Sequence, residues 1–75
     1  MTEHLLDARG LSCPLPILKA GRALNRLQVG DALRVLSTDP VSAADFEDFC
    51  RAAGAELVEA KEDGGTYSFL IRRLA

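Results

Sequence analysis

Two prolines separated by a single residue, in the run Cys13-Pro14-Leu15-Pro16, restrict the fold of this chain more than any other feature of its sequence. Proline lacks a backbone N–H and has a φ close to the helical value, so a helix tolerates it in the first turn but not in the interior. The run therefore predicts a helix that begins at Pro14. The residue before a proline is held in extended geometry, so we expect Cys13 at the N-cap position.

A cysteine at a helix start is a candidate nucleophile. The unpaired amides and the dipole of a first helical turn favour negative charge, so they favour the thiolate of Cys13 over its thiol. Because Pro16 has no N–H, the amide of Leu15 is the donor that we expect to reach the sulfur. The alternative interpretation is that Cys13 is a small hydrophobic residue that happens to precede a helix, since free cysteines are commonly buried.

Hydrophobic spacing divides the chain into four strand patterns and two helix patterns, in the order β-α-β-α-β-β. Apolar residues at helical spacing include Ala20 and Leu24 in the first helix and Phe46 and Cys50 in the second. The predicted strands cover residues 4–8, 32–37, 56–60 and 67–71, and the predicted helices run from Pro14 to about Leu27 and from Pro40 to a C-cap at Gly54.

Two helices with one apolar stripe each cannot cover both faces of a sheet. We therefore expect an α+β two-layer sandwich, in which both helices pack on one face of a four-stranded mixed sheet. The glycines of Glu62-Asp63-Gly64-Gly65 suit a tight hairpin between the last two strands, which we expect to be antiparallel neighbours. The pattern leaves the strand order open. With 75 residues, we expect a single domain over residues 1–75.

Composition argues against several classes of function. Only 5% of the residues are aromatic, so the small core is expected to lack room for a deep substrate cavity. The net charge of −2 argues against direct nucleic-acid binding, which depends on clustered cations. No segment approaches the roughly 20 apolar residues of a membrane span, and the first four residues lack a signal-peptide pattern. We expect a cytoplasmic protein with reduced thiols that presents a surface site to protein partners.

The remaining candidate ligands and nucleophiles give weaker signals. Cys50 lies on the apolar stripe of the second helix and is expected to be buried and unreactive. There is no Cys-x-x-Cys and the only histidine is His4, so we predict no metal site and no cofactor. Asp39 also precedes a proline, so it is expected first of all to cap the second helix, and a role at the site is secondary.

A basic face on the first helix is formed by Lys19, Arg22 and Arg26. Charged helix faces are commonly no more than solvated surfaces. The functional alternative is a docking surface that attracts acidic partners toward Cys13.

These residues resemble the TusA family of sulfur-carrier proteins, which includes SirA-like proteins. The resemblance rests on four segments in the family's order and spacing: Leu6 to Pro16 with its Cys-Pro-x-Pro motif, Thr38-Asp39-Pro40, Asp45 to Cys50, and Tyr67 to Arg73. It implies the same two-layer sandwich and a persulfide carried on one residue, Cys13. The residues that would support the motif are Pro14, Leu15, Pro16 and Asp39.

The resemblance also implies protein partners. A cysteine desulfurase or a rhodanese-type protein would place a sulfane sulfur on Cys13, and a cysteine of an acceptor protein would remove it. The chain would then be a sulfurtransferase-type carrier and not a stand-alone catalyst. Family members serve tRNA thiolation, molybdenum-cofactor supply or dissimilatory sulfur oxidation, and the sequence does not choose among them. Leu15 stands where some tRNA-thiolation members have glutamate, a departure that weakens the case for that pathway.

Two rival functions are compatible with the same residues. In a thiol redox regulator, Cys13 would be oxidised to a sulfenic acid or a mixed disulfide, and no sulfur would be passed on. In a plain interaction module, the chain would dock through its basic face and Cys13 would only cap a helix. Only the carrier requires a transferred sulfur on Cys13.

Overall fold

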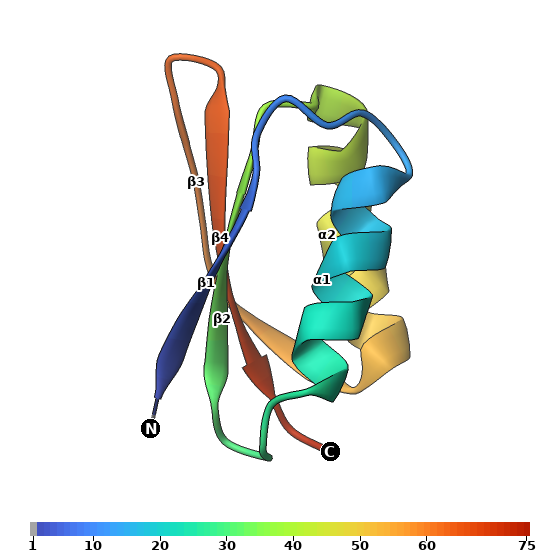
Figure 1. The fold of residues 1–75 in the computed structure, drawn as a ribbon, viewed down its shortest axis with the longest axis vertical. Helices are drawn as coiled ribbons and strands as arrows, with labels where there is room; N and C mark the ends of the chain where they lie inside the picture. Colours follow the sequence, from blue (N-terminus) through green and yellow to red (C-terminus); the bar gives the residue numbers. More distant parts are fainter. Residues whose placement is uncertain (1) are drawn as a thin grey trace.

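The computed structural model describes residues 2–75. Along the chain it contains β1 (Glu3–Ala8), α1 (Leu15–Asn25), β2 (Ala32–Ser37), α2 (Pro40–Ala53), β3 (Ala55–Asp63) and β4 (Thr66–Arg73). Both helices lie on the same face of the sheet and form a second layer beside it (Figure 1). The predicted α+β sandwich and its β-α-β-α-β-β order are confirmed. Neither helix within residues 2–75 is long and apolar enough to cross a membrane.

The sheet has the strand order β1-β2-β4-β3. The β1–β2 pair is parallel, and the β2–β4 and β3–β4 pairs are antiparallel, so the sheet is mixed as expected. The two last strands are longer than predicted because their hairpin turn uses only Gly64 and Gly65, with φ of 58° and 88°. A two-residue turn of this kind needs the left-handed region at both positions, which glycine adopts without strain.

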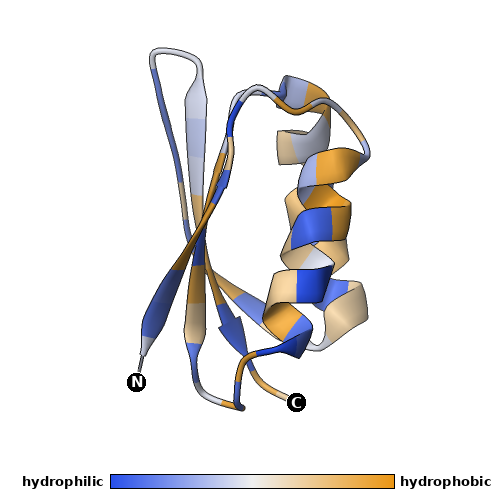
Figure 2. Ribbon diagram, viewed as in Figure 1, coloured by the Kyte–Doolittle hydropathy of each residue, from blue (hydrophilic) through white to orange (hydrophobic). Residues whose placement is uncertain are grey.

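The core lies between the sheet and the helices. Phe46 of α2 is fully buried and stacks on Phe69 of β4, with ring centroids 4.5 Å apart. Hydrophobic and hydrophilic residues alternate around α1, as expected for a helix with one buried stripe (Figure 2). Most of the other buried residues around the aromatic pair are aliphatic, and the set comprises Ala20, Leu24, Leu27, Leu33, Val35, Cys50 and Ile71.

The end of α1 is held by a residue that is distant in sequence. The helix stops at Asn25, two residues before the predicted end. Nη1 of Arg73, from β4, donates to the carbonyl oxygens of Leu24, Asn25 and Leu27 at 3.3, 3.2 and 2.6 Å. The last carbonyls of a helix lack intrahelical partners and attract cations, so Arg73 caps α1 from another element.

The parallel pairing of β1 with β2 brings two loops together. The last residues of the two strands, Ala8 and Ser37, pair with each other, so β1 and β2 end at the same level. The loop from β1 to α1 therefore lies beside the loop from β2 to α2, at the end of the molecule opposite the two termini (Figure 1). The Cys-Pro-x-Pro run and Thr38-Asp39-Pro40 become neighbours in this way.

Candidate functional site

Cys13 is exposed in the loop between β1 and α1. Ser12 to Leu15 form a tight turn with the cis Cys13–Pro14 peptide bond at its centre, and the N–H of Leu15 donates to the carbonyl of Ser12 at 2.9 Å. Pro16, by contrast, is fully buried. The exposed thiol therefore stands three residues before a proline that is fixed in the protein interior.

The predicted capping role of Cys13 is wrong. The helix begins at Leu15, and its N-cap is Pro14, which makes no side-chain capping hydrogen bond. The amide of Leu15, which we expected to reach the sulfur, is occupied by Ser12. Within residues 2–75, no hydrogen bond reaches Sγ of Cys13. The physical reason is the tight turn, which uses the Leu15 amide locally before the helix begins.

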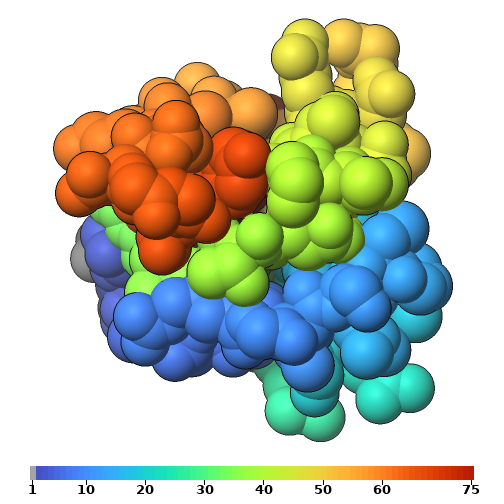
Figure 3. Space-filling view, turned by 90° about the horizontal axis from the view of Figure 1, so that it is seen from above, coloured from blue at the N-terminus to red at the C-terminus, as the bar shows by residue number. Residues whose placement is uncertain are grey.

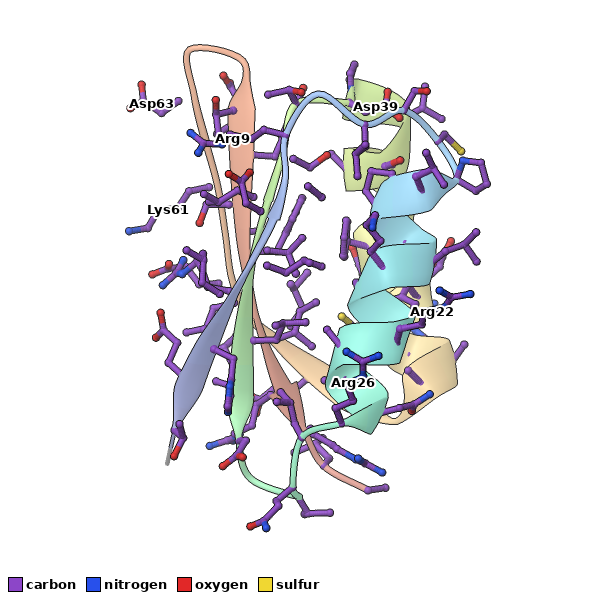
Figure 4. All side chains as sticks on the ribbon, in the orientation of Figure 1. Arg9, Arg22, Arg26, Asp39, Lys61 and Asp63 are labelled. Atoms are coloured by element: carbon purple, nitrogen blue, oxygen red, sulfur yellow. The ribbon has the colours of Figure 1, made fainter. Side chains whose placement is uncertain are left out.

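Asp39 joins the second loop to Cys13. Its Oδ2 accepts the backbone N–H of Cys13 at 2.6 Å and the hydroxyl of Ser42 at 2.9 Å. Its Oδ1 accepts the N–H of Val41 at 3.3 Å, which confirms the predicted N-cap of α2. The hydroxyl of Ser42 and the amides of Cys13 and Val41 hold the pKa of Asp39 below its ordinary value. Figure 4 places Asp39 at the end of the molecule where the two loops meet.

A second hydrogen bond ties the same loops together. Oγ1 of Thr38 accepts the N–H of Gly10 at 2.9 Å, and Gly10 has a φ of 81°, which favours glycine. Sequence reasoning missed both bonds between the loops because it had left the strand order open. The sequence did contain a signal that the two loops are neighbours. In each loop a strand is followed by a residue that precedes a proline, and then by a helix. Consecutive strands of a β-α-β unit are commonly neighbours, and parallel neighbours place their following loops side by side.

Cys50 has the surroundings predicted for it. It is 2% exposed in the core, and burial raises the pKa of its thiol to about 11. A thiol that stays protonated near neutral pH is a poor nucleophile. Across residues 2–75, no three His, Cys, Asp or Glu side chains gather as the ligands of a metal ion would.

The basic residues predicted for docking lie together on α1. Lys19, Arg22 and Arg26 are exposed, and Figure 4 shows the two arginines on this helix. With Leu6 and Ala23 they line a shallow hollow of about 210 Å³. The ion pairs found among residues 2–75 use other cations, so these three carry uncompensated positive charge.

Two leucines next to the motif add an apolar part to the same helix face. Leu15 is 43% exposed and Leu18 is 56% exposed. Together with Lys19 and Arg22 they line a second hollow of about 140 Å³. Sequence reasoning missed Leu18, although its place outside the buried stripe of α1 is a signal for exposure.

A larger hollow of about 370 Å³ lies between α2 and the β3–β4 hairpin. Viewed from above, the hairpin and the start of α2 lie at the same end of the molecule as the loop after β1 (Figure 3). The lining of the hollow is mostly apolar and consists of Pro40, Ala43, Ala44, Ala60, Lys61, Glu62, Tyr67 and Phe69. Cys13 is not part of this lining, so the hollow does not enclose the thiol.

The chain is similar to known proteins over almost its whole length. Residues 4–73 match the family model described as sulfurtransferase TusA. The chain is 52% identical over 71 residues to the sulfur carrier protein TusA of Allochromatium vinosum, an alignment that covers 95% of this chain and 93% of that relative. It is 42% identical over 73 residues to the sulfur carrier protein TusA of Pseudomonas aeruginosa, with coverage of 97% and 92%.

A solved structure gives an independent comparison. The SirA-like protein from Desulfitobacterium hafniense superposes with a TM-score of 0.81 at 26% sequence identity, over 95% of this chain and 97% of that chain. The resemblance inferred from four short segments is therefore confirmed along the sequence and in the fold. The match over residues 4–73 shows that this chain belongs to the TusA family.

Proposed function

We propose that this chain is a sulfur carrier that accepts a sulfane sulfur as a persulfide on Cys13 and passes it to an acceptor protein. The observation that supports this most is the exposed Cys13 on a loop held by Asp39 on one side and by the buried Pro16 on the other. A carrier must be reached by two partners in turn, and an enclosed thiol would exclude both. The relatives named sulfur carrier proteins support sulfur as the cargo.

The chemistry consists of two thiol–persulfide exchanges. The Cys13 thiolate attacks the outer sulfur of a persulfide on the donor protein, and a new S–S bond forms while the S–S bond of the donor breaks. The donor cysteine leaves as a thiolate, and the proton stays on the transferred sulfur. An acceptor thiolate then attacks that same outer sulfur, and Cys13 leaves as a thiolate. Both steps are displacements without net oxidation, so neither needs an added oxidant or a cofactor.

The docking face of the carrier is assigned to the exposed side of α1, formed by Leu15, Leu18, Lys19, Arg22 and Arg26. Its uncompensated cations would attract and orient an acidic surface, since charge complementarity mainly increases the association rate. Its leucines would bury apolar area against the partner next to Cys13. The donor is a cysteine desulfurase or a rhodanese-type protein with an acidic rim around its persulfide.

The acceptor is a protein of one of three pathways, which are tRNA thiolation, molybdenum-cofactor supply and dissimilatory sulfur oxidation. Leu15 lies between the two prolines and is exposed beside Cys13. Some tRNA-thiolation members have glutamate at this position. The leucine side chain favours an acceptor that presents an apolar surface to Leu15 over one that presents a cation for a glutamate. The relay operates in a reducing compartment such as the cytoplasm, where an exposed thiol stays free.

The proposal is tested by intact mass spectrometry of the protein after incubation with a cysteine desulfurase and cysteine, or with a rhodanese and thiosulfate. One added sulfur atom is expected in the wild type and in Cys50→Ser, and none in Cys13→Ser. Dithiothreitol should remove the added mass, because it reduces a persulfide. Addition of an acceptor thiol should move the sulfur from Cys13 to that acceptor.

The rival functions give different results in the same experiment. If both donor systems leave the wild type unlabelled while peroxide modifies Cys13, the chain is a redox regulator and the carrier proposal fails. If neither donor nor peroxide modifies Cys13, a docking module is favoured. In that case the Cys13→Ser variant should keep full binding to its partner.

A further inference from the structure

The carboxylate of Asp39 carries out two separate tasks with its two oxygens. Oδ1 accepts the Val41 N–H and so caps α2, while Oδ2 accepts the Cys13 N–H. A cap alone does not need a carboxylate, because Ser, Thr and Asn cap helices about as well. Only a carboxylate offers acceptors on both sides, since a hydroxyl has one oxygen and an amide has one oxygen and one donor group.

The position of Asp39 is itself fixed by two buried serines. The hydroxyl of Ser42 donates to Oδ2 at 2.9 Å, and the backbone N–H of Asp39 donates to Oγ of Ser37 at 3.2 Å. Both serines are fully buried. The carboxylate that meets Cys13 therefore belongs to the rigid part of the molecule, and its orientation is set before any partner arrives.

The hydrogen bond to Cys13 is charge-assisted and, at 2.6 Å, short. It acts on the backbone of Cys13 and leaves the thiol exposed. Thr38 holds Gly10 in the same way, so the loop is tied at two points before the turn that leads into α1. A loop tied at these points keeps the sulfur at a constant place relative to the docking face of α1.

We propose that Asp39 is a positioning residue for sulfur transfer, which fixes the Cys13 backbone so that Sγ meets the partner's persulfide in line for attack. This role rests on the proposed function. Transfer between two proteins needs the reacting sulfurs aligned while both surfaces are docked, whereas a small reagent approaches an exposed thiol from any direction. Loss of the bond should therefore slow transfer from a protein donor far more than reaction with a small molecule.

The test compares Asp39→Ser and Asp39→Asn with the wild type in single-turnover transfer from a persulfidated cysteine desulfurase. Both substitutions keep a capping oxygen for α2 but remove the second carboxylate oxygen and the negative charge, which the hydrogen bond to the Cys13 amide uses. The rate constant of sulfur transfer at saturating donor is expected to fall by about tenfold or more, because a small misplacement of the reacting groups has an effect of this size. The donor concentration at half saturation and the rate of Cys13 alkylation by iodoacetamide should change by no more than about twofold, because the docking face and the exposure of the thiol are kept.

A structural readout accompanies the kinetics. Hydrogen exchange of the Cys13 amide, followed by NMR, should become faster in Asp39→Ser, because its acceptor is gone. Asp45→Asn is the matched control, since it removes an exposed carboxylate of α2 that makes no side-chain hydrogen bond or ion pair within residues 2–75. This control should match the wild type in both transfer and amide exchange.

Three outcomes separate the possibilities. Wild-type transfer rates in Asp39→Ser with fast exchange of the Cys13 amide would overturn the positioning role. Equal losses of transfer and of iodoacetamide reactivity would also overturn it, because they would point to general damage of the loop. Absence of any persulfide on wild-type Cys13 would overturn the proposed function itself, and is recognised before the variants are compared.

Discussion

Cys13 and Cys50 carry the same functional group in opposite surroundings. Cys13 is exposed on a loop, whereas Cys50 is 2% exposed among the hydrophobic side chains of the core. A charged sulfur loses its hydration there, which is why burial raises the pKa of Cys50 to about 11. Burial and the raised pKa both make Cys50 a poor nucleophile, which leaves the exposed Cys13 as the candidate site.

Alkylation of the native protein with iodoacetamide at about pH 8 is expected to modify Cys13 and to spare Cys50. With a pKa of about 11, only about one Cys50 thiol in a thousand is ionised at that pH, and burial also blocks the reagent. Peptide mass mapping identifies the modified site, and urea should expose Cys50 to the reagent. Rapid labelling of Cys50 in folded Cys13→Ser protein would contradict this prediction.

The roles of single residues could be predicted where they depend on neighbours in sequence. The cap at Asp39 follows from its place before a proline, and the left-handed Gly54 at the end of α2 follows from its place after the apolar stripe. The errors at Cys13 and Leu15 have a different origin. Two local structures competed for the Leu15 amide, a capped helix and a tight turn, and helix rules alone do not rank them.

At the scale of elements, α1 depends on β4 for its C-terminal end. The side chain of Arg73 donates to two carbonyls at the end of α1 and to that of Leu27 just beyond it. Its backbone pairs with Gly30 and Asp31 in the loop after the helix. The helix that follows Cys13 is thus tied at its far end to the last strand. No sequence pattern predicts this contact, because it joins residues more than 40 positions apart.

Replacement of Arg73 by methionine is expected to lower the free energy of unfolding by about 2 kcal/mol, the usual size for hydrogen bonds that involve a charged group. Methionine keeps much of the apolar stem of arginine, so the loss reports on the guanidinium. Urea unfolding followed by circular dichroism measures it. Arg51→Met is the control, because its exposed pairs with Glu47 and Asp48 should contribute less than about 0.5 kcal/mol. Equal effects of the two substitutions would show that Arg73 is not a cap.

For the whole molecule, charge is distributed unevenly between the two helices. The net charge is −2, yet the docking face of α1 is positive, while Asp45, Glu47 and Asp48 make the exposed side of α2 acidic. An acidic partner is therefore attracted by one helix and repelled by the other. This asymmetry would orient the carrier during the encounter, before any close contact forms.

Reversal of two charges on the docking face, in Arg22→Glu with Arg26→Glu, is expected to raise the donor concentration at half saturation by about tenfold or more. The association rate should also lose most of its dependence on salt, because screening acts on the attraction that has been removed. Stopped-flow binding to a cysteine desulfurase measures both quantities. Arg51→Glu on α2 is the control and should change binding by no more than about twofold.

Persulfide loading of the double variant by inorganic polysulfide should equal that of the wild type, because a small donor does not use the docking face. Unchanged binding of the double variant to the donor protein would refute the docking face and leave the chemistry of Cys13 intact.

The layers of the fold could be predicted from sequence, but the order of the strands could not. Hydrophobic spacing tells which residues face the core, and it correctly placed both helices on one side of the sheet. It does not tell which strands are neighbours, because that depends on long-range pairing. The hydrogen bond between Asp39 and Cys13 could not be predicted for the same reason, since it forms only because β1 lies beside β2.

The strand order also determines when the chain can fold as it leaves the ribosome. Of the four strands within residues 2–75, β4 comes last in the chain, yet it occupies an inner position of the sheet and links the β1–β2 pair to β3. Until it emerges, β3 has no neighbouring strand and α1 lacks its Arg73 cap. The nascent chain can therefore complete the four-stranded sheet, and the cap at the C-terminal end of α1, only after β4 has been synthesised.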